Sequence, residues 1–131
     1  MSQIPWQEVL GWGNKELTDL RYVAYAYIQQ GIYDVALTVF EALAVLTPPT
    51  AYDFQTMGAV YLQLGNGLKA LEYLDKALKV DPSHLPSQLN RAKALFLLGY
   101  RKQALNQTIE LEKCNVAEIA AQASALTLSY R

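Results

Sequence analysis

The sequence reads GIYDVA at residues 31–36, GNGLKA at residues 65–70 and GYRKQA at residues 99–104. Each stretch opens with a glycine, carries an alanine five residues later and lies 34 residues from the next stretch. A fixed period of this length is typical of proteins that stack one supersecondary unit on another. The three stretches therefore divide most of the chain into blocks at residues 17–50, 51–84 and 85–118.

Each block has the pattern of two helices joined by a turn. Apolar side chains recur at intervals of three and four residues on both sides of each glycine, as on one face of a helix. In the first half of the second block these are Phe54, Met57, Gly58, Tyr61 and Leu62. Glycine has no Cβ and enters the left-handed conformation that ends a helix at little cost. Pro48 and Pro82 should end the second helices, because proline cannot donate a backbone hydrogen bond.

The period and the recurring residue types resemble the tetratricopeptide repeat, a helix-turn-helix unit. Small residues recur where paired helices must touch: Ala24, Gly58 and Ala92, then Ala36, Ala70 and Ala104. The resemblance implies an all-α fold of three tetratricopeptide helix-turn-helix repeats in a right-handed superhelix, with a short N-terminal helix and a C-terminal capping helix. We expect a single domain over residues 1–131, made of an N-terminal helix or arm (1–16), three repeats (17–50, 51–84 and 85–116) and a capping helix (117–131).

The repeat pattern weakens toward the C-terminus. Thr108 stands where an apolar residue is expected and Val116 where a proline is expected, so the array should end there. The final helix has an apolar stripe of Ile119, Ala123, Leu126 and Tyr130, with Glu118, Gln122 and Arg131 facing outward. Such an amphipathic helix is the expected cap for the open end of a repeat array.

A short helix is expected before the first repeat. Pro5 suits its first turn. The helix should contain Trp6, Val9 and Leu10 and should end at Gly11 and Gly13. Asn14 should cap the helix that follows. Trp6 and Trp12 either pack against the first repeat, which we favour, or contact another chain. The same segment could equally serve as a dimerisation arm and give a homodimer.

Composition excludes several classes of function. The 131 residues carry a net charge of −1 and no basic block, which argues against nucleic acid. No apolar run approaches the roughly 20 residues of a membrane span. Cys114 is the only cysteine and no secretory signal is visible, so a reducing cytoplasm is the expected compartment.

Catalytic chemistry has little support. His84 is the only histidine, lies between Pro82 and Pro86, and is expected to be a solvated turn residue. Cys114 is expected to be a small apolar residue in a helix, and one histidine with one cysteine gives no zinc site. We therefore expect no enzyme activity, no metal and no cofactor.

The resemblance to tetratricopeptide proteins implies a concave groove lined by the first helix of each repeat. Carried onto this chain, the groove-facing positions include Arg21, Tyr25, Ile28, Tyr52, Gln55, Leu62, Leu89, Lys93 and Phe96. Ile28 and Leu62 fit the core of the repeats equally well. Tetratricopeptide proteins that clamp a terminal carboxylate use lysine and asparagine where this chain has Arg21 and Tyr25. We therefore expect an apolar or amphipathic peptide as the ligand.

A narrower resemblance covers about half of the chain. The run GIYDVALTVFEALAVLTP, from Gly31 to Pro48, and the repeat after it resemble the small tetratricopeptide chaperones of bacterial type III secretion systems. Gly31, Tyr33, Ala36, Phe40 and Leu43 carry the match, whereas Thr47 departs from the aspartate that is common in the family. These chaperones serve pore-forming translocators or the needle subunit.

The resemblance implies a non-catalytic chaperone. It would hold an apolar or amphipathic segment of a secretion substrate, such as a translocator or needle subunit, in its groove before export, with or without a second small co-chaperone. Tyr25, Tyr52, Leu62, Leu89 and Phe96 would supply apolar contacts, and Arg21 and Lys93 would orient polar groups at the edge. The alternative is a generic scaffold or assembly factor that joins folded proteins.

Overall fold

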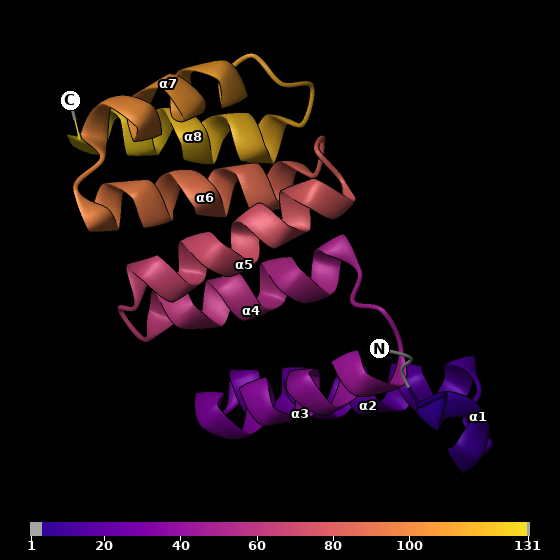
Figure 1. Ribbon diagram of the computed structural model, residues 1–131. Helices are drawn as coiled ribbons and strands as arrows, with labels where there is room; N and C mark the ends of the chain where they lie inside the picture. The colour runs from indigo at the N-terminus through magenta and orange to yellow at the C-terminus, as the bar shows by residue number, and fades with distance from the viewer. Residues whose placement is uncertain (1–3, 131) are drawn as a thin grey trace. The chain divides into compact units, whose positions relative to one another are not determined.

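The computed structural model describes residues 4–130, which form eight α-helices and no strand (Figure 1). The helices are α1 (Trp6–Leu10), α2 (Asn14–Gln29), α3 (Tyr33–Leu46), α4 (Ala51–Gln63), α5 (Gly67–Val80), α6 (Leu85–Leu98), α7 (Arg101–Leu111) and α8 (Ala117–Tyr130). The expected all-α fold of three helical hairpins, with one helix before them and one after, is confirmed. The chain divides into two compact units between Pro49 and Thr50, here called unit 1 and unit 2. The single domain and the handedness of a superhelix stay predictions.

The repeated glycines end their helices in one way. Gly31, Gly65 and Gly99 have φ values of 77°, 76° and 87°, in the left-handed region that a side chain makes costly. Each glycine N–H donates to the carbonyl three residues earlier, and the next N–H donates to the carbonyl five residues before it. Gly11, with φ 67°, ends α1 with the same pair of bonds. These bonds satisfy carbonyls that a helix end otherwise leaves without partners.

Helix starts were less predictable than helix ends. The N-cap of α2 is Gly13 rather than Asn14, and Glu16 accepts a hydrogen bond of 2.9 Å from the Gly13 N–H. The expectation for Asn14 was therefore wrong, because Glu16 satisfies that amide from inside the helix. At α4, the Thr50 hydroxyl accepts from the Asp53 N–H at 3.0 Å, and the Asp53 carboxylate accepts from the Thr50 N–H at 3.1 Å. This reciprocal pair fixes the start of unit 2.

Unit 1 consists of α1, α2 and α3. Its core lies between α2 and α3, where Ala24 and Ala36 have no exposed surface and Phe40 is 2% exposed. The ring of Tyr25 stands edge-on to Phe40, with centroids 6.0 Å apart. Helix α1 packs on α3 but buries none of its own residues.

Unit 2 forms two layers of helices. The first helices α4 and α6 contact each other, and the capping helix α8 contacts α6. In Figure 1, α5 lies between α4 and α6, and α7 lies beside α8. Helix α5 packs on α4 and α6, and α7 packs on α6 and α8. Ala70, Ala92 and Ala104 are fully buried at the crossings. A Cβ on Gly58 would lie 2.7 Å from Leu74 Cγ, so the helices approach closely there.

Helix α8 caps unit 2 as expected. Ala123 is buried, Ile119 and Leu126 pack on the apolar clusters below, and Glu118 and Gln122 are exposed. Arg131, which was expected to face outward, lies outside the described residues. Thr108 stands where an apolar residue was expected, and hydrogen bonds satisfy its buried hydroxyl. The Thr127 hydroxyl donates to the Thr108 hydroxyl at 2.9 Å, and the Thr108 hydroxyl donates to the Leu105 carbonyl. The third hairpin therefore closes through a buried polar pair.

Candidate functional site

The first helices of unit 2 carry the most accessible of the predicted binding residues. Tyr52 is 56% exposed near the start of α4, with its ring edge-on to that of His84. Gln55 and Leu62 on α4 and Lys93 on α6 are half-buried. Leu62 also packs against the cluster of Ala70, Leu74 and Ala94, so it serves the core and the surface together. Tyr52, Gln55, Leu62 and Lys93 are called the α4–α6 face below.

Leu89 and Phe96, which were also predicted to bind a ligand, are buried. Leu89 is 4% exposed and packs with Leu111 and Ala123, and Phe96 is 8% exposed. The ring of Phe96 stacks on that of Tyr130, with centroids 4.0 Å apart and planes 13° apart. The expectation that both supply accessible apolar contacts is corrected, because helix α8 covers them.

The predicted residues of unit 1 share helix α2. Arg21, Tyr25 and Ile28 are all half-buried, and the rings of Tyr25 and Phe40 pack in a T-shaped pair. Part of the Tyr25 side chain therefore packs in the core of unit 1 and is not available to a ligand.

One prediction about a single residue is refined and one was wrong. His84 lies in the turn before α6 as expected, but it is only partly exposed at the N-cap of α6, and its Nδ1 is 2.7 Å from the hydroxyl of fully buried Ser87. Cys114 lies not in a helix but in the turn after α7, where its thiol donates to the Val116 carbonyl at 3.5 Å. Within residues 4–130, no three His, Cys, Asp or Glu side chains are grouped so that they could hold a metal ion.

A polar network that sequence spacing did not reveal ties three helices of unit 2 together. Arg91 on α6 donates through Nε to Asp75 on α5 at 2.7 Å and through Nη1 to Gln107 on α7 at 3.2 Å. Asp75 and Gln107 each stand 16 residues from Arg91, a separation to which no local helical rule applies. The network holds the second-helix layer against α6.

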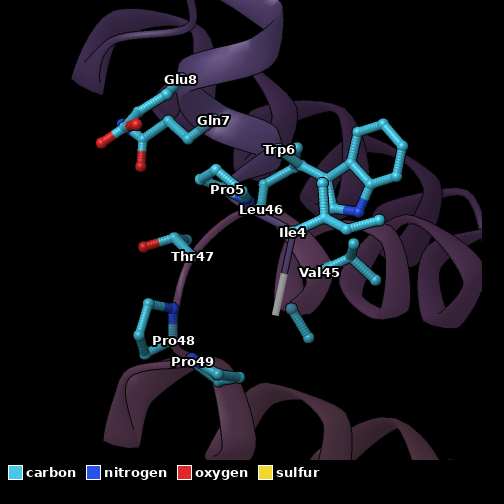
Figure 2. Close-up of a pocket in the computed structure, with 11 residues that line it drawn as sticks. Ile4, Pro5, Trp6, Gln7, Glu8, Val45, Leu46, Thr47, Pro48 and Pro49 are labelled. Atoms are coloured by element: carbon cyan, nitrogen blue, oxygen red, sulfur yellow. The ribbon is translucent and has the colours of Figure 1, made fainter. Parts of the chain in front are cut away.

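Sequence reasoning also missed a pocket in unit 1. The N-terminal segment and the end of α3 enclose about 460 Å³ (Figure 2). The pocket is lined by Ile4, Pro5, Trp6, Gln7, Glu8, Ala44, Val45, Leu46, Thr47, Pro48 and Pro49. Ile4 is 55%, Trp6 39% and Val45 60% exposed, so the N-terminal segment packs on α3 while leaving apolar surface open. In the sequence, the adjacent Pro48 and Pro49 together with Trp6 were the residues that could have indicated this pocket.

No helix within the described part of the chain is both long enough and apolar enough to cross a bilayer.

Residues 54–84 match the family model of the tetratricopeptide repeat. No curated protein sequence matches the chain.

Solved structures share the fold over nearly the whole length. The type III secretion translocator chaperone SycD of Yersinia enterocolitica is 20% identical, with a TM-score of 0.83 over 98% of each chain. PcrH in complex with the chaperone binding region of PopD is 24% identical, with a TM-score of 0.81 over 92% of this chain and 94% of the other; PcrH is from Pseudomonas aeruginosa. The first tetratricopeptide domain of Spaghetti (RPAP3), bound to the HSP90 peptide SRMEEVD, is 19% identical, with a TM-score of 0.76 over 90% and 92%. The chain thus has the fold of the secretion chaperones that its sequence resembles.

Proposed function

We propose that this protein is a non-catalytic chaperone that holds an apolar or amphipathic segment of a type III secretion substrate in the cytoplasm before export. The observation that carries the proposal is the fold shared with PcrH, whose structure contains the chaperone binding region of PopD. A translocator or needle subunit is the class of substrate that we infer. A second small co-chaperone belongs to the same proposal, whereas a homodimer through the N-terminal helix is the alternative use of the α1 surface.

The proposed contacts follow the exposure of the first helices. In unit 2, Tyr52 and Leu62 offer apolar surface, and Gln55 and Lys93 offer hydrogen-bonding groups beside it. In unit 1, Ile28 and the exposed part of Tyr25 offer apolar surface, and Arg21 is the cation. Leu89 and Phe96 take a supporting role in the proposal, because α8 and the Tyr130 ring cover them.

The mechanism is one of burial rather than reaction. A substrate segment with apolar side chains aggregates or assembles when it is exposed to water, and covering it yields about 25 cal/mol per Å² of apolar area. Helix-in-groove binding, with side-chain anchors at intervals along the segment, is the mode that fits a layer of first helices. The chaperone therefore acts by holding the segment and releasing it unchanged.

The similarity to a domain bound to the HSP90 peptide SRMEEVD does not lead to a carboxylate-binding proposal. Arg21 and Tyr25 stand at the positions of the lysine and asparagine that the clamp needs, and Gln55 of the next repeat does not restore it. An apolar or amphipathic segment is the better ligand for this set of side chains.

Affinity purification from the source cell tests the proposal. We expect the tagged wild-type protein to co-purify with a secretion substrate identified by mass spectrometry. A Tyr52→Glu/Lys93→Glu variant should lose that substrate, because it places carboxylates on the α4–α6 face. Phe96→Glu is unsuitable, since a buried charge would unfold unit 2.

Leu68→Glu is the matched control, because Leu68 is 70% exposed on the second helix α5. All variants should keep the helical circular dichroism of the wild type. Equal recovery of the substrate by the Tyr52→Glu/Lys93→Glu variant would exclude the α4–α6 face. Recovery of folded scaffold partners in place of a secretion substrate would favour the generic scaffold.

A further inference from the structure

The pocket of unit 1 has the dimensions and lining of a binding site. Its volume of about 460 Å³ lies within the range of roughly 300–1,000 Å³ that is usual for ligand pockets. The exposed lining is polar and apolar in about equal parts, and Gln7, Glu8 and Thr47 are the residues with polar side chains. Such a mixture of apolar and polar surface favours an amphipathic ligand.

The N-terminal wall of the pocket leaves apolar surface accessible. Helix α1 is five residues long and buries none of them. Trp6 is 39% exposed, and Val45, at the end of α3, is 60% exposed. Val9 and Leu10 of the same short helix lie outside the pocket lining and are 62% and 50% exposed. Aromatic side chains in accessible pockets are the usual energetic centres of protein interfaces.

The pocket walls are largely preformed. Pro5 precedes α1, and Pro48 and Pro49 follow α3, so three ring-constrained residues set the backbone around the opening. The turn at Gly11 closes the end of α1 with two backbone hydrogen bonds. These constraints reduce the free energy that ordering of the backbone would cost on binding.

Charge selects the ligand. Glu8 is the one charged residue among those lining the pocket. Unit 1 carries five acidic side chains, Glu8, Glu16, Asp19, Asp34 and Glu41, against the two basic ones of Lys15 and Arg21. Figure 2 shows Ile4, Trp6 and Val45 on one side of the pocket and the Gln7 and Glu8 side chains together on the other. The indole face is also a favourable neighbour for a cation.

We propose that this pocket is a docking site for a partner polypeptide segment that carries an apolar side chain next to a lysine or arginine. The apolar side chain lies against Ile4, Trp6 and Val45, and the cation lies beside Glu8. The site shares no residue with the α4–α6 face and does not depend on the function proposed for it.

Fluorescence titration of the full-length protein tests this site. Trp12→Phe leaves Trp6 as the only tryptophan. The probes are three short amphipathic peptides of one length: leucine with lysine, leucine with serine, and leucine with glutamate. We expect the leucine–lysine peptide to shift the Trp6 emission and to bind most tightly. The leucine–glutamate peptide should bind most weakly.

Two variants separate the apolar and the charged contributions. Val45→Lys should lower the affinity for the leucine–lysine peptide by about ten-fold or more, because it blocks the apolar wall and places a positive charge near the lysine of the peptide. Glu8→Gln keeps the shape of the side chain and removes its charge. It should lower the affinity for the leucine–lysine peptide roughly two- to five-fold and leave the affinity for the leucine–serine peptide unchanged. Leu68→Lys on unit 2 makes the same exposed change elsewhere and should have no effect.

Three outcomes of these experiments bear on the proposal. Equal affinity of the lysine and glutamate peptides, or equal binding by Val45→Lys and Leu68→Lys, would overturn the proposal. Sedimentation showing a concentration-dependent dimer that Val45→Lys abolishes would assign the pocket to a second copy and would also overturn it. The Tyr52→Glu/Lys93→Glu variant should bind the leucine–lysine peptide normally, so failure of this site and failure of the proposed function are distinguishable.

Discussion

Single small residues set the spacing of helices in unit 2. Gly58 on α4 faces Leu74, which has no exposed surface, and a Cβ added to Gly58 would lie 2.7 Å from the branched Cγ of that leucine. A branch carbon in a closed core cannot move aside as the end of a flexible side chain can. The small residue at this position of the repeat is therefore required by shape rather than by hydrophobicity.

Gly58→Ala should destabilise the protein. Overpacking of this kind costs about 1–3 kcal/mol, which exceeds the gain of at most ~1 kcal/mol from higher helix propensity. Urea denaturation followed by circular dichroism should show a lower midpoint.

The control removes the side chain that clashes. In a Leu74→Ala background, Gly58→Ala should be neutral or stabilising, because only the helix propensity is left. A destabilisation of equal size in both backgrounds would show that the contact with Leu74 is not the cause.

At the scale of elements, helix α8 decides which side chains of α6 are accessible. It covers Leu89 and Phe96, which repeat spacing placed on a binding surface, and its Tyr130 ring stacks on Phe96. It is also joined to α7 by the buried hydroxyl pair of Thr108 and Thr127. The last hairpin and the cap are therefore one packed element rather than a repeat and an appendage.

The hydroxyl pair can be measured by a double-mutant cycle. Thr108→Val and Thr127→Val should each cost about 1 kcal/mol of unfolding free energy, because each leaves a buried hydroxyl without one partner. The double variant should cost clearly less than the sum of the two. Additive costs in urea denaturation would mean that the two hydroxyls do not stabilise the cap as a pair.

The sequence predicted elements better than it predicted surfaces. The 34-residue period located three hairpins, because glycine in the left-handed region and proline after a helix have strong local causes. The burial of Leu89 and Phe96 was not predictable, since it depends on where α8 packs. The Gly13 cap and the Asp75–Arg91 pair depend on side-chain geometry that a spacing rule does not contain. The binding role of the α4–α6 face stays a prediction.

At the scale of the molecule, the two units differ in the size of their cores. Of the described residues, six apolar side chains are buried in unit 1 and fourteen in unit 2. Unit 2 also contains the Asp75–Arg91–Gln107 network and the threonine pair. A domain of about 50 residues is marginal without such reinforcement.

We expect residues 50–131 to fold alone and residues 1–49 not to do so. The longer fragment should show helical circular dichroism and a cooperative thermal transition, whereas the shorter one should show weak helicity with no transition. The intact chain measured in parallel is the reference. A non-cooperative melt of residues 50–131 would contradict the assignment of the main core to unit 2.

The matched glycine endings have a consequence for growth of the protein. Gly65 and Gly99 terminate α4 and α6 with the same backbone bonds, so residues 66–99 form a cassette whose two ends have the same local geometry. A tandem duplication of that cassette would place the same local backbone geometry at both junctions and lengthen the protein by one hairpin. The local backbone geometry at these junctions is therefore compatible with gene duplication, which is one way in which repeat proteins can become longer.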